Sequence, residues 1–277
     1  MVDRRWWGIS LLLAATFAMG CEPKCREVET LDEIEARTIE RFDERLDSID
    51  ATDDQRSKIH ALIRGTMPSI AELRKQTLPR QREIMAELKR PQPDRDKLSD
   101  LIGKNIDAGN AYMHELIDVM MKGHAVLTRE QREQLAREAS EPSEQFEGSW
   151  LLDRAVDLFL SRIDANPEQR KLVDKMKADL ITRGRGLQKK ADALRREAAQ
   201  EFAKDKPDAK KIHATLDRGR DLTRTALYDL AGYYLLLASK LDPRQRQVLN
   251  AELVRFEPCP SKRPASTQTA LSLPPRF

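Results

Sequence analysis

The sequence predicts an all-α protein made of two tandem, kinked antiparallel helical hairpins, each with a lead helix and a short closing helix. Composition is one reason, because only 11 of the 277 residues are glycine, 5% are aromatic and 34% are charged, a balance typical of long helices. An ungapped internal repeat is another. A six-residue helix-start motif, which occurs twice in each repeat, is the third.

The internal repeat has a constant shift of 114 residues, which relates position 51 to 165 and position 127 to 241. The same shift relates Ile49-Asp50-Ala51 to Ile163-Asp164-Ala165 and Pro93-Asp94 to Pro207-Asp208. A repeat of this length indicates a duplicated structural unit. We therefore expect a first unit over 21–140, a linker over 141–149 and a second unit over 150–256. A signal peptide over 1–20 and a proline-rich, disordered tail over 257–277 complete the expected plan.

The helix-start motif is clearest in Leu127-Thr128-Arg129-Glu130-Gln131-Arg132 and in Leu241-Asp242-Pro243-Arg244-Gln245-Arg246. The second residue of each copy can cap the first helical turn with its side-chain oxygen. Three residues later a glutamine can return the hydrogen bond, which completes a capping box. The four predicted pairs are Thr52 with Gln55, Thr128 with Gln131, Asn166 with Gln169, and Asp242 with Gln245. Leu127 and Leu241 are expected to anchor the closing helices.

Apolar residues at helical spacing place the elements of the first unit. A lead helix is expected over 26–50, and its acidic outer face could pair with the basic segment 171–196. A second helix is expected over 53–89, with kinks at Pro68 and Pro79. After a turn at 90–94, a third helix should return antiparallel to about residue 126, and a closing helix should end near residue 140.

The second unit repeats this plan with a shorter lead helix over 150–163. A long helix is expected over 167–204, a turn at 205–208, a partner helix to residue 240 and a closing helix over 243–256. Gly184 and Gly186, rather than prolines, should loosen the long helix of this copy.

The N-terminus has the layout of an export signal. Arg4 and Arg5 precede an apolar run from position 6 to 19 that is too short to span a bilayer. The sequence Ala18-Met19-Gly20-Cys21 resembles a bacterial lipoprotein cleavage site, which implies lipidation of Cys21. Glu22 after this cysteine favours the outer membrane by analogy with enteric sorting. The alternative is a buried hydrophobic helix at the start of the domain.

Two further cysteines, Cys25 and Cys259, lie near the ends of the mature chain. In an oxidising compartment they could form a disulfide. Two separate thiols are the alternative, because sequence does not give the distance between them.

The Leu127-Thr128-x-x-Gln131 motif, placed after a helical hairpin with a Pro-Asp turn, resembles the Spy and CpxP family of bacterial periplasmic proteins. The wider relatives include the zinc-associated ZraP type and CnrX-like heavy-metal sensors. The resemblance covers about residues 45–256, and Leu241-Asp242-x-x-Gln245 keeps all of the motif but the threonine. It implies small, curved helical cradles, commonly dimeric. Two such units in one chain could form an intramolecular pseudo-dimer in place of a homodimer.

The resemblance also implies an ATP-independent chaperone or envelope-stress factor that binds unfolded or envelope proteins. No catalytic motif is recognisable in the sequence, so we expect no enzyme activity. A non-catalytic scaffold for one envelope partner is an alternative. Nucleic acid is not expected as a partner, because the net charge is only +3 and basic residues alternate with acidic ones.

A periplasmic heavy-metal sensor or resistance protein is the other alternative. We expect no cofactor other than a divalent transition metal such as Zn, Cu or Ni. His60 and His124 could face each other across the first hairpin, with Met120 nearby, and these side chains would suit such an ion. Against a metal site, the second copy has Asp174 and Ala238 at the equivalent positions, and methionine at helical spacing usually fills a core.

Overall fold

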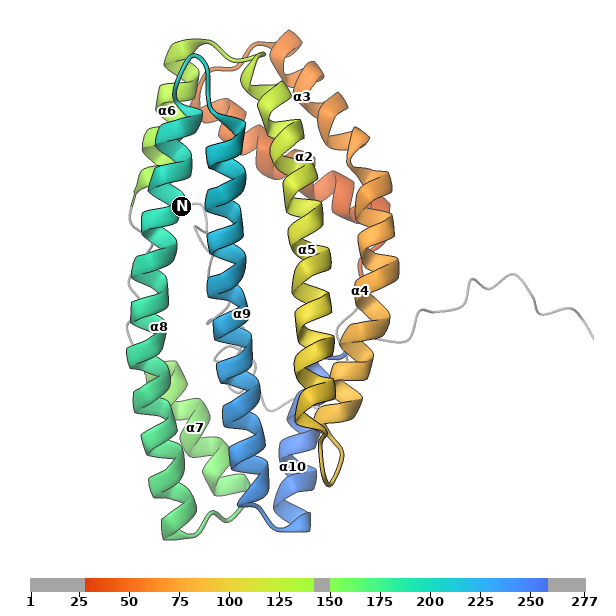
Figure 1. Cartoon of the computed structure of the whole chain (residues 1–277), viewed down its shortest axis with the longest axis vertical. Helices are drawn as coiled ribbons and strands as arrows, with labels where there is room; N and C mark the ends of the chain where they lie inside the picture. Colours follow the sequence, from red (N-terminus) through yellow and green to blue (C-terminus); the bar gives the residue numbers. More distant parts are fainter. Residues whose placement is uncertain (1–27, 142–149, 259–277) are drawn as a thin grey trace, which may run out of the picture.

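The computed structural model describes residues 28–141 and 150–258, which form helices joined by short turns (Figure 1). The all-α prediction is confirmed, because no β-strand occurs in these two ranges. The signal peptide, the cysteines Cys21, Cys25 and Cys259, and most of the predicted linker and tail lie outside the described residues.

The first half of the chain contains α2 (Leu31–Ser48), α3 (Asp53–Gly65), α4 (Met67–Leu88), α5 (Arg95–His124) and α6 (Arg129–Ser140). The second half contains α7 (Trp150–Arg162), α8 (Pro167–Phe202), α9 (Ala209–Ser239) and α10 (Pro243–Leu253), followed by a 3₁₀ turn over Val254–Phe256. In each half the two longest neighbours, α4 with α5 and α8 with α9, are antiparallel and joined by a short turn (Figure 1).

Two predicted elements differ from the observed ones for local reasons. The lead helix α2 begins at Leu31 rather than near residue 26, because Thr30 and Glu33 form a further capping box. The predicted helix over 53–89 is two helices divided at Thr66. Pro68 lies in the first turn of α4, where its missing amide costs nothing, whereas Pro79 lies inside α4.

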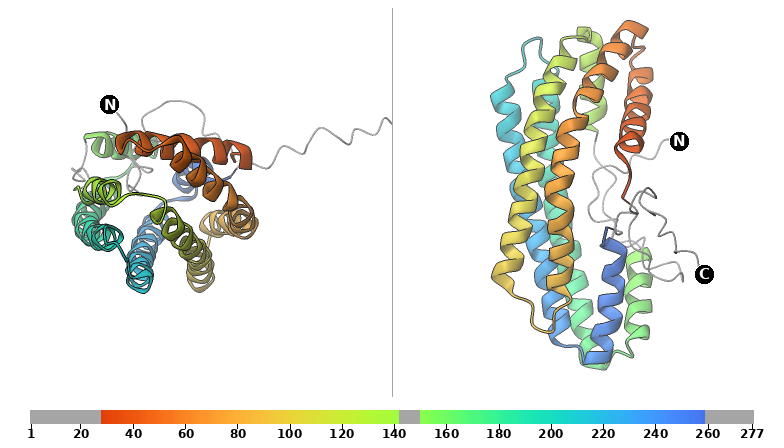
Figure 2. Two further views of the ribbon diagram at one scale, coloured as in Figure 1. Left: turned by 90° about the horizontal axis from the view of Figure 1, so that it is seen from above. Right: turned by 90° about the vertical axis from the view of Figure 1, so that its right-hand side faces the viewer.

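The long helices α4, α5, α9 and α8 lie side by side in that order as a curved layer (Figure 2, left). The seam between the two halves is the contact of α5 with α9. Helix α6, from the first half, packs against α8 of the second half. Helix α2 lies across the open side of the curved layer (Figure 2).

The acidic residues of α2 do not pair with segment 171–196, so that expectation was wrong. They pair instead with the neighbouring helix α3. Arg56 Nη2 lies 2.7 Å from Asp47 Oδ1, and Arg64 Nε lies 3.1 Å from Glu35 Oε1. Adjacent helices joined by a four-residue turn bring these charges together locally, before any long-range contact is needed.

Three clusters of buried apolar side chains form the core. Two are equivalent under the 114-residue shift and surround the motifs, and they contain Leu46, Ile49 and Leu127 in the first half and Leu160, Ile163 and Leu241 in the second. The third lies between α4 and α5 near their turn and also contacts Leu253 of α10. The two halves therefore share core contacts.

The first residues of the predicted disordered tail are packed rather than free. Glu257 forms an ion pair with Lys89 at the end of α4, and Pro258 is buried. Within the described ranges, the helices are either too short or too polar to cross a lipid bilayer.

Candidate functional site

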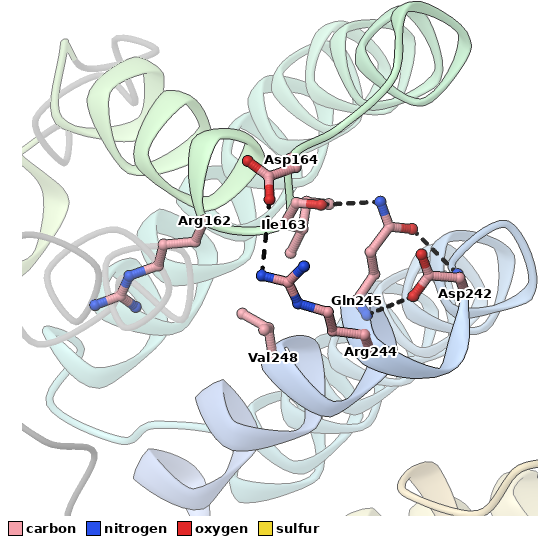
Figure 3. A pocket seen from close by; sticks show the side chains of 7 residues that line it. All are labelled: Arg162, Ile163, Asp164, Asp242, Arg244, Gln245 and Val248. Carbon is pink, nitrogen blue, oxygen red and sulfur yellow. Dashed lines mark hydrogen bonds and ion pairs between the residues drawn. The ribbon is translucent and has the colours of Figure 1, made fainter.

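All four predicted capping boxes form in the structure. The side chain of each capping residue accepts from the amide of its glutamine, at 3.3 Å for Thr52 and Thr128, 2.9 Å for Asn166 and 2.8 Å for Asp242. The glutamine Oε1 accepts in return from the amide of the capping residue. Figure 3 shows this reciprocal pair for Asp242 and Gln245 at the start of α10.

The two motif glutamines of each half also bind each other. Gln55 Nε2 donates to Gln131 Oε1 at 2.8 Å, and Gln131 Nε2 donates back to Gln55 Oε1 at 3.0 Å. In the second half, Gln169 and Gln245 exchange the same bonds at 2.8 and 3.2 Å. We call each such pair a glutamine clamp. It joins the start of α3 to the start of the closing helix α6 in the first half, and the start of α8 to the start of the closing helix α10 in the second.

Each clamp also satisfies backbone carbonyls that the neighbouring helix ends leave open. Gln55 donates to the Val126 carbonyl at 3.0 Å, and Gln131 donates to the Ile49 carbonyl at 3.3 Å. Gln169 and Gln245 donate to the equivalent carbonyls of Lys240 and Ile163, both at 2.9 Å. Buried amide groups are stable only when they are hydrogen-bonded in this way. The glutamine therefore has a structural role that goes beyond capping one helix.

The last residue of each motif is arginine, and its guanidinium donates to the carbonyl of the first motif residue. These bonds join Arg56 to Ala51, Arg132 to Leu127, Arg170 to Ala165 and Arg246 to Leu241, at 2.8–3.3 Å. In each copy of the motif, a hydrogen bond therefore joins the last residue to the first, in addition to the capping box. The arginine recurs in all four copies of the motif, but its residue type alone does not predict this contact.

Two of these arginines also contact the opposite half at matching positions. Arg132 Nη2 lies 2.7 Å from Asp205 Oδ1, in the turn between α8 and α9. Arg246 Nη1 donates to the Pro91 carbonyl at 3.1 Å, in the turn between α4 and α5. Positions 91 and 205 are equivalent under the shift, so the contacts are reciprocal, as in a two-fold dimer interface.

The hairpin turns are fastened by buried carboxylates, Glu87 in the first half and Glu201 at the equivalent position. The Glu87 side chain is 2% exposed. It accepts from the Asp94 amide at 2.8 Å and pairs with Lys97 and Arg90. The hydrogen bond from the Asp94 amide, with help from these cations, holds the pKa of Glu87 below its ordinary value. Lys204 and the Asp208 amide likewise lower the pKa of Glu201.

The seam between α5 and α9 brings polar side chains of the two halves into contact. His114 Nδ1 and His213 Nδ1 are 2.6 Å apart, and the two rings stack with centroids 4.8 Å apart. His114 Nε2 also lies 3.0 Å from Asp217. At the equivalent place on the other end of the seam, the Tyr228 hydroxyl donates to the Ser99 carbonyl. The duplicated halves have therefore diverged at this contact.

The candidate metal ligands do not share one site. His60 Nε2 lies 2.7 Å from Asp43 of α2, whereas His124 is buried and its Nε2 lies 2.9 Å from the Lys204 carbonyl. Met120 is 39% exposed on α5. Within the described ranges, His, Cys, Asp and Glu side chains form no group of three or more that could hold a metal ion.

A small cavity of about 120 Å³ lies beside the second motif, between the end of α7 and the start of α10 (Figure 3). Arg162, Asp164 and Arg244 surround its mouth, and Arg244 Nη2 lies 3.9 Å from Asp164 Oδ2. Typical small-molecule sites are several times larger, about 300 Å³ or more. We therefore assign it no ligand.

The fold and the paired motifs define an all-helical protein assembled around capped and clamped helix starts. Comparison with known families agrees with this description. Residues 37–139 match the model described as LTXXQ motif family protein, so this part of the chain is similar to that family. No curated protein matches the chain, and no solved structure does.

Proposed function

We propose that the chain is a lipid-anchored periplasmic protein of Spy and CpxP type that binds unfolded or envelope proteins without ATP and without catalysis. Two facts support this proposal. The family match covers 37–139, and the second half repeats the same motifs and clamps. In this proposal Cys21 carries the lipid, and the anchor holds the protein at the outer membrane.

We further propose that the two halves are two cradle units that form a pseudo-dimer within one chain. The reciprocal contacts of Arg132 with the second hairpin turn and of Arg246 with the first support this interpretation. Isologous contacts of this kind are typical of symmetric homodimers. A duplication would then have joined two subunits that were once separate.

The observation that carries the binding proposal is the set of exposed apolar side chains on the two central helices. Met120 on α5 and Leu236 on α9 are each 39% exposed, and Tyr228 is 37% exposed. Exposed charged side chains also lie along these two helices. Isolated apolar contacts among mobile charges suit weak binding to many extended chains, and methionine adapts well to varied partners.

An aggregation assay tests this function. A reduced, unrelated client protein should scatter less light when the protein is present in several-fold excess without ATP. A Met120→Gln, Leu236→Gln double variant should protect the client less. A matched control, Leu31→Gln with Phe42→Gln on α2, removes two side chains that are each 37% exposed and should protect normally.

The other outcomes distinguish the alternatives. If the unmodified protein does not suppress scattering, the scaffold interpretation is favoured over a general chaperone. Saturable heat on titration with zinc, copper or nickel, lost in a His60→Ala, His124→Ala variant, would favour the metal sensor. For the anchor, Cys21→Ser should lose membrane fractionation and accumulate as precursor, and unchanged partitioning would contradict lipidation.

A further inference from the structure

A row of basic side chains runs along the solvent-facing side of α8. Positions 171, 175, 178, 182, 185, 189, 193 and 196 fall on one face of a helix with 3.6 residues per turn, and all eight residues are exposed. Five are basic, two are alanine and one is threonine. The basic side chains, which we call the α8 stripe, are Lys171, Lys175, Arg185, Lys189 and Arg196.

The α8 stripe has few close counter-charges within the described part of the molecule, although Lys175 helps to lower the pKa of Asp179. Its five side chains form no ion pair or hydrogen bond there, although ion pairs are abundant elsewhere on the same helix. The acidic helix α2, the natural internal partner by charge, is engaged with Arg56, His60 and Arg64 of α3. The stripe is therefore available to a ligand outside the chain.

The complete stripe occurs only in the second half. At the places equivalent to Lys171, Lys175 and Arg185 the first half has Ser57, Ala61 and Ala71, whereas Lys75 and Arg82 stand at the places equivalent to Lys189 and Arg196. Its helix is also interrupted at Thr66, whereas α8 is continuous over 36 residues.

The geometry of the stripe suits a flat anionic surface. Twenty-five residue steps at about 1.5 Å each make a straight row roughly 37 Å long. Ala178, Thr182 and Ala193 are short enough to let a surface approach, and the stripe has no large apolar side chain that would insert into lipid. Helix α8 lies at the edge of the curved layer (Figure 1), where only α9 and α6 pack heavily against it.

We propose that the α8 stripe docks the protein electrostatically on anionic phospholipid headgroups. The charge of the molecule supports this orientation. Helix α8 has ten basic and six acidic residues, a net charge of +4, whereas α2 has three basic and seven acidic residues, a net charge of −4. Clustered Lys and Arg side chains bind anionic lipid with an attraction that is lost within a Debye length of the surface. This inference does not depend on chaperone activity.

Vesicle co-sedimentation of the full chain tests the proposal. Binding to vesicles containing phosphatidylglycerol is compared with binding to pure phosphatidylcholine, and the ratio is the measured quantity, because any apolar or lipid anchor contributes to both. The ratio should be well above one and should fall toward one in high salt. Replacing all five stripe residues with Gln should reduce it about tenfold or more.

A matched control removes five exposed basic residues from other helices, with Lys58, Lys75, Lys104, Lys122 and Arg244 all changed to Gln. The control has the same net charge as the stripe variant, and it should keep most of the preference for anionic vesicles. Equal losses in both variants would show a general charge effect and overturn the proposal. A stripe variant that binds normally but changes its sedimentation coefficient would also overturn it, because α2 of a second copy would then be the partner.

Discussion

At the scale of single residues, the motif glutamines join local and long-range structure. Each caps its own helix start, and each binds a glutamine 76 residues away along the chain. The cap was predictable from sequence, because a capping box depends on residue types three positions apart. The clamp was not, because helical periodicity does not say which helix starts meet. The signal that could have suggested it is the presence of two such glutamines in each half.

The clamp changes the expected order of stability losses in the first half. Leu127 is 7% exposed, so Leu127→Ala should cost about 2–5 kcal/mol of unfolding free energy. Gln131→Ala should cost roughly 1–3 kcal/mol, because it leaves buried polar partners unsatisfied. Thr128→Ala removes one cap and should cost about 1 kcal/mol.

Urea denaturation of the three variants measures this order. Leu241→Ala, Gln245→Ala and Asp242→Ala should rank in the same way in the second half. If Thr128→Ala were less stable than Leu127→Ala, the capping role of Thr128 and the core role of Leu127 would be contradicted. If Gln131→Ala abolished client protection without loss of stability, the glutamine would have a direct role in binding.

At the scale of elements, the helix types and most helix ends followed from sequence, and the exceptions have local causes. The sequence predicted a kink near Pro68, whereas the structure has a break between two helices at Thr66. Proline removes one backbone hydrogen-bond donor, but this does not determine how far the chain changes direction. The hairpin turns were placed correctly from Pro93-Asp94 and Pro207-Asp208. Their fastening by Glu87 and Glu201 was missed, because a lone glutamate on a charged helix has the pattern of a solvated residue.

These turn carboxylates predict how stability depends on pH. Because folding lowers the pKa of Glu87 and Glu201, their contribution is fully present above the unfolded value, about 4.3, and is lost as the pH falls through the folded value. Glu87→Gln should therefore be less stable than the parent at neutral pH, and its stability should fall less steeply in acid. Thermal melts from pH 7 to pH 3 check this, with the exposed Glu83→Gln as control. Parallel curves for Glu87→Gln and the parent would contradict the assignment.

At the scale of the whole molecule, the halves interlock rather than stand side by side. Helix α6 lies on the second half, and residues of α10 reach the turn of the first. The duplication was visible in the sequence as a constant shift. The contacts of the closing helices with the opposite half were not, because a repeat relates equivalent positions but does not say which surfaces of one unit meet the other.

Interlocking predicts one cooperative unfolding transition for both halves. Asp205→Ala, in the second half, removes the partner of Arg132 and should loosen α6 of the first half. Hydrogen exchange in α6 should therefore become faster, while exchange in α10 stays close to that of the parent. Two separate calorimetric transitions, or faster exchange confined to the second half, would show that the halves are independent.

The glutamine clamps also constrain how the length of the chain can evolve. Each clamp joins two glutamines that lie at the two ends of a hairpin, one before its first arm and one after its second. The two glutamines are 76 residues apart along the chain in both halves. A two-turn insertion in one arm alone would carry its glutamine out of register with its partner. Insertions must therefore occur in both arms together, and the closing helix of the opposite half must still reach the displaced turn. This coupling accounts for a duplication whose copies have diverged widely in residue type while keeping the same number of residues.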